Sequence, residues 1–173
     1  ECCTMARTTF PVVQCGKSYI RVGDGEAFLN GMEPVDCSCI DPARRSGQGK
    51  KTVLLADCEP EVAQLKPLLL AKARRVIIKL APMLDVSLAL RQLPHATEVA
   101  ILSVQNEWKG LLVVLERGAP TAVTIQCLNL VGDAPQEFSF TRESEQEAVC
   151  NYPPHIGNYL YEPNASILKA GAY

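Results

Sequence analysis

Two consecutive predicted strands joined by a very short connection constrain the fold of this chain most strongly. Residues 98–104 and 111–116 are rich in Val, Leu and Ile, and only the six residues 105–110 separate them. A crossover between parallel strands needs a dozen or more residues, whereas antiparallel neighbours can be joined by a short turn. We therefore predict that these two segments form an antiparallel hairpin.

The sequence before the hairpin alternates short β-branched runs with helical patterns. Strands are predicted over residues 18–22, 35–40, 75–80 and 99–104. Helices are predicted over 61–73 and 87–93, with a further short helix after a glycine turn at 23–25. Such alternation is typical of parallel βαβ units whose strands are buried on both faces. The predicted class is α/β, with a parallel sheet that ends in the antiparallel hairpin.

The pattern changes after Gly118. Residues 121–130 and 137–142 are predicted strands, a proline-rich stretch follows, and residues 166–172 are a predicted helix with Asn164 as its N-cap. We therefore divide the chain into a first domain, residues 1–118, and a small α+β segment, residues 119–173.

Composition narrows the function classes. Hydrophobic residues make up 47% and charged residues 21%, which favours a folded protein. The net charge of −2 gives no general attraction to nucleic acid, so any such binding must be local. Without an apolar run of about 18 residues or a leader pattern, we expect a cytoplasmic protein with no membrane partner. None of the eight cysteines forms a CxxC pair, which favours structural thiols and no metal site.

Asp41 and Pro42 end the predicted strand 35–40 and are followed by Ala43, Arg44 and Arg45. Ligands of open α/β sheets bind at the carboxyl ends of strands. Asp41 could therefore accept a hydrogen bond from a substrate amine or from a cofactor's amino group, and Arg44 could hold a phosphate. The alternative is an Asx-Pro turn followed by two solvated arginines.

Two further segments place charged groups at strand ends. Asp24, between Gly23 and Gly25, could accept a hydrogen bond from an adenine amino group, although Gly-Asp-Gly is also a common turn sequence. Lys79, near the end of the predicted strand 75–80, should face the ligand cleft at the carboxyl ends of the strands, or a carboxylate. We favour pairing with Asp41, Asp57 or Asp85 over a catalytic role, because a buried lysine needs a partner.

Taken together, these motifs resemble one family, the bacterial class I S-adenosylmethionine-dependent methyltransferases with a C-terminal THUMP-like domain. The resemblance rests on Gly23-Asp24-Gly25, Ile40-Asp41-Pro42-Ala43-Arg44-Arg45, and segments 57–60, 79–85 and 161–166. It implies a Rossmann-like sheet and S-adenosylmethionine as cofactor. It also implies methyl transfer, with RNA as the substrate that the THUMP-like name suggests. The implied cofactor-binding residues are Gly23, Asp24, Gly25 and Asp41. The implied catalytic motif contains Asp41, Pro42 and Arg44, and Lys79 is a further catalytic candidate.

The chain also departs from that family. The glycine-rich first loop and the acidic end of the following strand are absent, and with them the methionine and ribose parts of a cofactor site. Because residue 1 is Glu, we expect a fragment: the C-terminal part of a methyltransferase domain and an incomplete THUMP-like domain, inactive alone. The alternatives are a non-catalytic RNA-binding or interaction module, and a nucleotide-binding oxidoreductase, which the hairpin disfavours.

Overall fold

A computed structural model describes residues 21–44, 55, 58–118, 122–151, 154–155 and 157–172. The chain forms two compact units, residues 1–33 and 34–173. In the first unit the described element is helix α2 (Gly25–Gly31), which begins where Asp24 caps it. The family resemblance implies a helix over residues 1–10; these residues, and residues 18–20 of the first predicted strand, lie outside the described part of the chain. Arg21 and Val22, the rest of that strand, belong to no strand.

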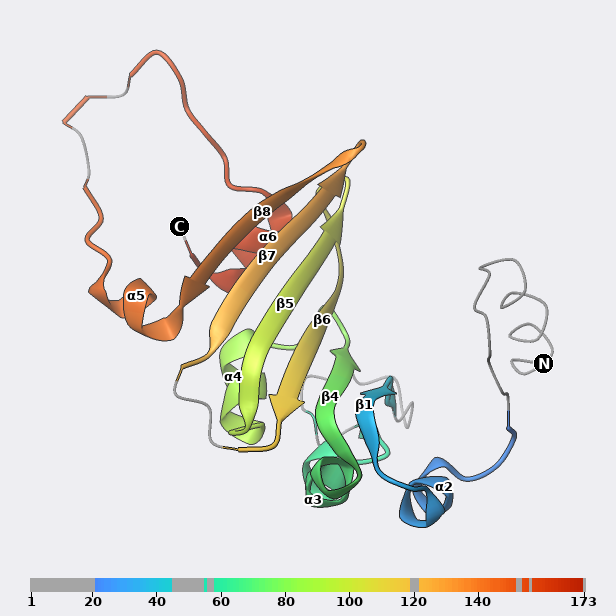
Figure 1. Cartoon of the computed structure of the whole chain (residues 1–173). Helices are drawn as coiled ribbons and strands as arrows, with labels where there is room; N and C mark the ends of the chain where they lie inside the picture. Colours follow the sequence, from blue (N-terminus) through green and yellow to red (C-terminus); the bar gives the residue numbers. More distant parts are fainter. Residues whose placement is uncertain are drawn as a thin grey trace. The chain divides into compact units, whose positions relative to one another are not determined.

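The second unit is built on a six-stranded mixed sheet with the strand order β1-β4-β6-β5-β7-β8 (Figure 1). The strands are β1 (Val35–Ile40), β4 (Ala73–Leu80), β5 (Ala96–Val104), β6 (Glu107–Glu116), β7 (Thr124–Val131) and β8 (Ala134–Thr141). Strand β1 is parallel to β4 and β5 is parallel to β7, whereas the other neighbours are antiparallel. The carboxyl ends of β1, β4, β5 and β7 therefore share one edge of the sheet.

The connection between β5 and β6 is a two-residue turn. Gln105 and Asn106 both have left-handed backbone angles, with φ of 49° and 64°. A turn with positive φ at both central residues matches the twist of the flanking strands, and asparagine tolerates this conformation well. The antiparallel pairing expected from the short connection is present, and the strands reach further toward the tip than their apolar runs indicated.

One face of the sheet is buried beneath helices. Helix α3 (Val62–Lys72) packs on β4, and α6 (Ala165–Ala170) packs on β5, β6 and β7. A further helix, α4 (Val86–Gln92), follows β4. The core side chains on this face, each at most 2% exposed, include Val76, Ile78, Leu80, Val99, Ile101, Leu111, Val113, Leu115, Ile125 and Cys127. Burial raises the pKa of the Cys127 thiol to about 11.

The opposite face corrects the expectation that both faces are covered. In β4 the residues alternate between buried and more exposed positions, and Arg75 forms ion pairs with Glu98 at 3.2 Å and Glu116 at 3.8 Å. Three of the five strand pairings are antiparallel, and such neighbours need no crossover helix above this face. Cys37 and Cys39 are also exposed rather than buried, because β1 lies at the edge of the described sheet.

A polar network, which we call the tip network, ties α6 to the sheet beside the β5–β6 turn. The side-chain oxygen of Asn129 accepts hydrogen bonds from the Ser103 hydroxyl (2.9 Å) and from the backbone amide of Asn106 (3.0 Å). Its side-chain nitrogen donates one to Gln136 (2.9 Å). The Asn106 side chain in turn accepts from the Ala165 amide at 2.7 Å. Helix α6 is thus held by polar groups as well as by apolar packing.

Trp108 adds to the attachment of α6. Its indole N–H donates to the Ala165 carbonyl, and the Lys169 ammonium lies 5.3 Å from the centre of its ring. Burial lowers the pKa of Lys169 from its ordinary value, and the nearby Asp85 carboxylate opposes that shift. A tryptophan at a hairpin tip can be packed or exposed, and its position in the sequence does not decide between the two. In the structure its indole N–H is anchored, while the residue as a whole stays 44% exposed.

The residues after 118 continue the same sheet. Strand β7 pairs with β5 over seven positions, from Glu98 opposite Thr124 to Val104 opposite Leu130. The helix α5 (Arg142–Glu147) follows β8, and α6 begins with Asn164 as its N-cap, as the sequence predicted. The division of the chain at residue 118 stays a prediction. Among the described residues, no helix combines the length and apolar character needed to cross a membrane.

Candidate functional site

Asp41 and Lys79 meet at the carboxyl ends of the parallel strands β1 and β4. Ile40 lies opposite Ile78, so the residues that follow them, Asp41 and Lys79, lie side by side. The Lys79 Nζ lies 2.5 Å from Asp41 Oδ2, and the side chains are 52% and 62% exposed. Of the three partners proposed for Lys79, the structure selects Asp41. Asp85 instead caps α4 by accepting from the Leu88 amide, and Asp57 lies outside the described residues.

The backbone after Asp41 is held by a second, small sheet. Pro42 is half-buried. Strand β2 (Ala43–Arg44) then pairs antiparallel with β3 (Cys58–Glu59). Asp41 therefore stands between two hydrogen-bonded segments, which hold its backbone in place. The side chain of Arg44 and the whole of Arg45 lie outside the described part of the chain.

Asp24 begins helix α2. Its Oδ1 accepts a hydrogen bond from the Ala27 amide at 2.7 Å, while its other carboxylate oxygen accepts none within the described residues. Neither Gly23 nor Gly25 has φ in the left-handed range, and a Cβ at either position would meet no atom within 4 Å. Folding of the described residues therefore does not require glycine at either position, contrary to the expected tight glycine turn.

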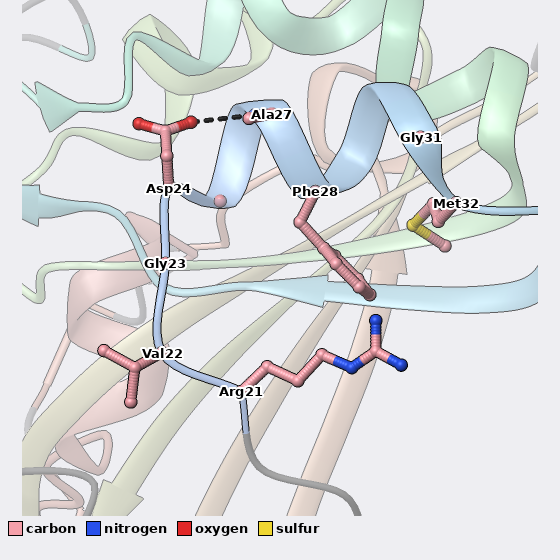
Figure 2. A pocket seen from close by; sticks show the side chains of 9 residues that line it. Arg21, Val22, Gly23, Asp24, Ala27, Phe28, Gly31 and Met32 are labelled. Carbon is pink, nitrogen blue, oxygen red and sulfur yellow. Dashed lines mark hydrogen bonds between the residues drawn. The ribbon is translucent and has the colours of Figure 1, made fainter.

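Residues of this segment line a hollow of about 860 Å³. Figure 2 shows the lining side chains, which include Arg21, Val22, Asp24, Phe28 and Met32. The Arg21 guanidinium lies 5.6 Å from the centre of the Phe28 ring. Apolar walls with a few polar groups are typical of small-molecule sites. A flat aromatic ring could lie against the apolar Val22 and Phe28, and an amino group on that ring could donate to Asp24. These residues therefore fit the adenine end of the cofactor that the resemblance implies.

Phe28 and Met32 are not among the site residues predicted from the sequence. They lie four and eight residues after Asp24, which places them on one side of a helix that begins there. That spacing is a signal which could have identified them. Elsewhere in the described chain, no three His, Cys, Asp or Glu side chains gather as metal ligands would.

Comparison with known proteins gives one informative likeness. No protein-family description matches the chain, and no curated protein matches it. Among solved structures, the chain is similar to the crystal structure of a "putative methyltransferase" from Porphyromonas gingivalis W83, with 31% identity and a TM-score of 0.82. The chain has a methyltransferase-like fold. The match covers 96% of this chain and 42% of that protein, so the chain spans less than half of its relative's length.

Proposed function

We propose that this chain takes part in S-adenosylmethionine-dependent methyl transfer, with RNA as the methyl acceptor. The observation that carries the proposal is the Asp41–Lys79 pair at the carboxyl ends of adjacent parallel strands, where ligands of open α/β sheets bind. The likeness to a protein described as a methyltransferase supports the class of reaction. RNA as acceptor rests on the sequence resemblance.

Bound S-adenosylmethionine supplies an activated methyl group. The protein then has to align the acceptor atom and keep water away. Lys79 holds the Oδ2 atom of Asp41, which leaves Oδ1 to accept a hydrogen bond or a proton from the acceptor's N–H or O–H. In this proposal Asp41 is the catalytic residue and Lys79 is a positioning residue.

The segment around Asp24 is proposed to hold the adenine ring. The free carboxylate oxygen of Asp24 can accept from the adenine amino group, while Val22 and Phe28, both largely exposed, can cover the ring. The open space beside Gly23 and Gly25 leaves room for a ligand close to the backbone.

Cofactor binding is tested by calorimetric titration of the protein as its gene encodes it. The variant Asp24→Asn removes the charged acceptor, but asparagine is an equally good N-cap, so α2 is retained. We expect affinity for S-adenosylmethionine to fall about tenfold, as for the loss of a hydrogen bond to a charged group. Asp36→Asn, on the exposed strand β1, is the matched control and should leave affinity unchanged. Equal affinity in both variants would remove Asp24 from the cofactor site.

The acceptor is tested with S-adenosylmethionine labelled in its methyl group and separate RNA, protein and small-molecule fractions from cells. We expect the label to enter RNA and to be released by ribonuclease. Label in protein alone would contradict RNA as the acceptor while leaving methyl transfer intact. Absence of label in every fraction would contradict the proposed function itself.

A further inference from the structure

A second cavity, of about 350 Å³, lies beside helix α4 and is lined by Ser87, Leu90, Arg91, Val123 and Arg142. Ser87, Leu90 and Arg91 belong to α4, Val123 comes directly before β7, and Arg142 is the first residue of α5. Strand β8 runs antiparallel to β7, so Arg142 follows the end of β8 at the sheet edge opposite Asp41. This cavity is therefore separate from the Asp41–Lys79 pair.

The two arginines of the cavity have no ion-pair partner among the described residues. Three other cations of this unit have acidic partners: Arg75 pairs with Glu98, Lys79 with Asp41 and Lys109 with Glu107. Within the described ranges, neither Arg91 nor Arg142 lies within ion-pair distance of a carboxylate. Two guanidinium groups that face one cavity repel each other, and an anion between them would remove that repulsion.

The hydrogen-bond geometry also favours an anion. An Arg142 Nη2 donates to the Ser87 hydroxyl oxygen at 2.6 Å, which fixes the guanidinium and leaves the hydroxyl proton free to be donated elsewhere. Each guanidinium has five N–H donors in a planar fork that matches phosphate oxygens. Leu90 and Val123 supply an apolar wall that reduces competition from water.

We infer that this cavity binds a phosphate group between Arg91 and Arg142. Several oxygens arranged in a tetrahedron can accept from both guanidiniums and from Ser87 together, which a planar carboxylate does less well. The phosphate can come from free phosphate or a phosphorylated small molecule, or from an RNA backbone. The inference does not depend on methyl transfer, and its test reads binding alone.

The probes are inorganic phosphate and a short oligouridine without terminal phosphates, titrated at constant ionic strength into the 173-residue chain. Binding is followed by calorimetry and by the NMR signals of arginine side-chain N–H groups. We expect Arg91→Gln and Arg142→Gln each to weaken binding about tenfold. Arg74→Gln removes the same charge from an exposed position on β4 and should leave binding unchanged.

The outcomes separate cleanly. Loss of phosphate binding in both cavity variants but not in Arg74→Gln supports the site, and parallel loss of oligouridine binding identifies RNA as a source. No binding of either probe by the wild-type chain, or equal effects in all three variants, would overturn the inference. Arg142 also contacts Ser87, so its variant is checked by circular dichroism. The exposed Arg91 carries the test if that variant is unfolded.

Discussion

Replacing Asn129 with alanine tests whether the tip network stabilises the second unit. Asn129 is 2% exposed and makes three hydrogen bonds, to Ser103, the Asn106 amide and Gln136. In Asn129→Ala, the Ser103 hydroxyl can still donate to the Leu128 carbonyl, at 3.3 Å. The Asn106 amide, however, loses the acceptor that Asn129 provides at the tip of the hairpin.

The magnitude follows from these contacts. Asn106 is itself exposed, so water can reach its backbone amide, and each of the two lost hydrogen bonds, to the Asn106 amide and to Gln136, costs about 0.5–1.5 kcal/mol; we therefore expect the free energy of unfolding to fall by about 1–3 kcal/mol. Urea denaturation followed by circular dichroism measures the change. Trp108, the one tryptophan in the sequence, reports separately on the hairpin tip through its fluorescence.

The matched control is Gln126→Ala, on the same strand but half-buried on the other face. We expect this change to cost no more than about 0.5 kcal/mol. If Asn129→Ala costs less than about 1 kcal/mol, or no more than the control, then water replaces Asn129 readily and the network does not stabilise the unit.

Three further perturbations have defined outcomes. Asp41→Ala should lower the free energy of unfolding by at most about 1 kcal/mol, because both members of its ion pair are more than half exposed. The rate of methyl transfer should fall about a hundredfold. An unchanged rate with a normal melting curve would leave Asp41 as a turn residue only. Cys127, with its pKa raised to about 11, should resist iodoacetamide at about pH 8 while the exposed Cys37 and Cys39 react; peptide mass mapping detects any rapid labelling of Cys127 that would refute its burial. Asn164→Ala removes the side chain that accepts from the Ile167 amide and should cost about 1 kcal/mol in urea unfolding, whereas Asn164→Ser should restore most of that stability.

Apolar pattern predicted the elements that face the core. Helix α3 lies within the predicted 61–73, because its spaced Val and Leu residues record which positions are buried. Strand β1 also has the predicted bounds, although none of its residues is buried. Helix α5 shows where that signal is absent. It has no buried residue and depends on a capping box between Thr141 and Ser144, so its sequence looks like part of a polar strand end.

The candidate site could be predicted only in part. The sequence correctly indicated that Lys79 pairs with a carboxylate, although the side chain is half exposed rather than buried. It left three partners open, because the choice depends on the register between two strands that are far apart in the chain. The contact between Arg142 and Ser87 has the same origin. It joins residues 55 positions apart, and no local pattern marks either of them as a neighbour of the other.

The unbroken pairing of β7 with β5 limits how this protein can be cut into smaller pieces. A chain that ended near residue 118 would expose the β5 edge, where seven residue pairs and the buried Ile125 and Cys127 now cover it. A long apolar strand edge is a template for pairing with other chains. A shortened protein of this kind should therefore tend to self-associate. A shortened chain that contains β5 should also contain β7 and β8.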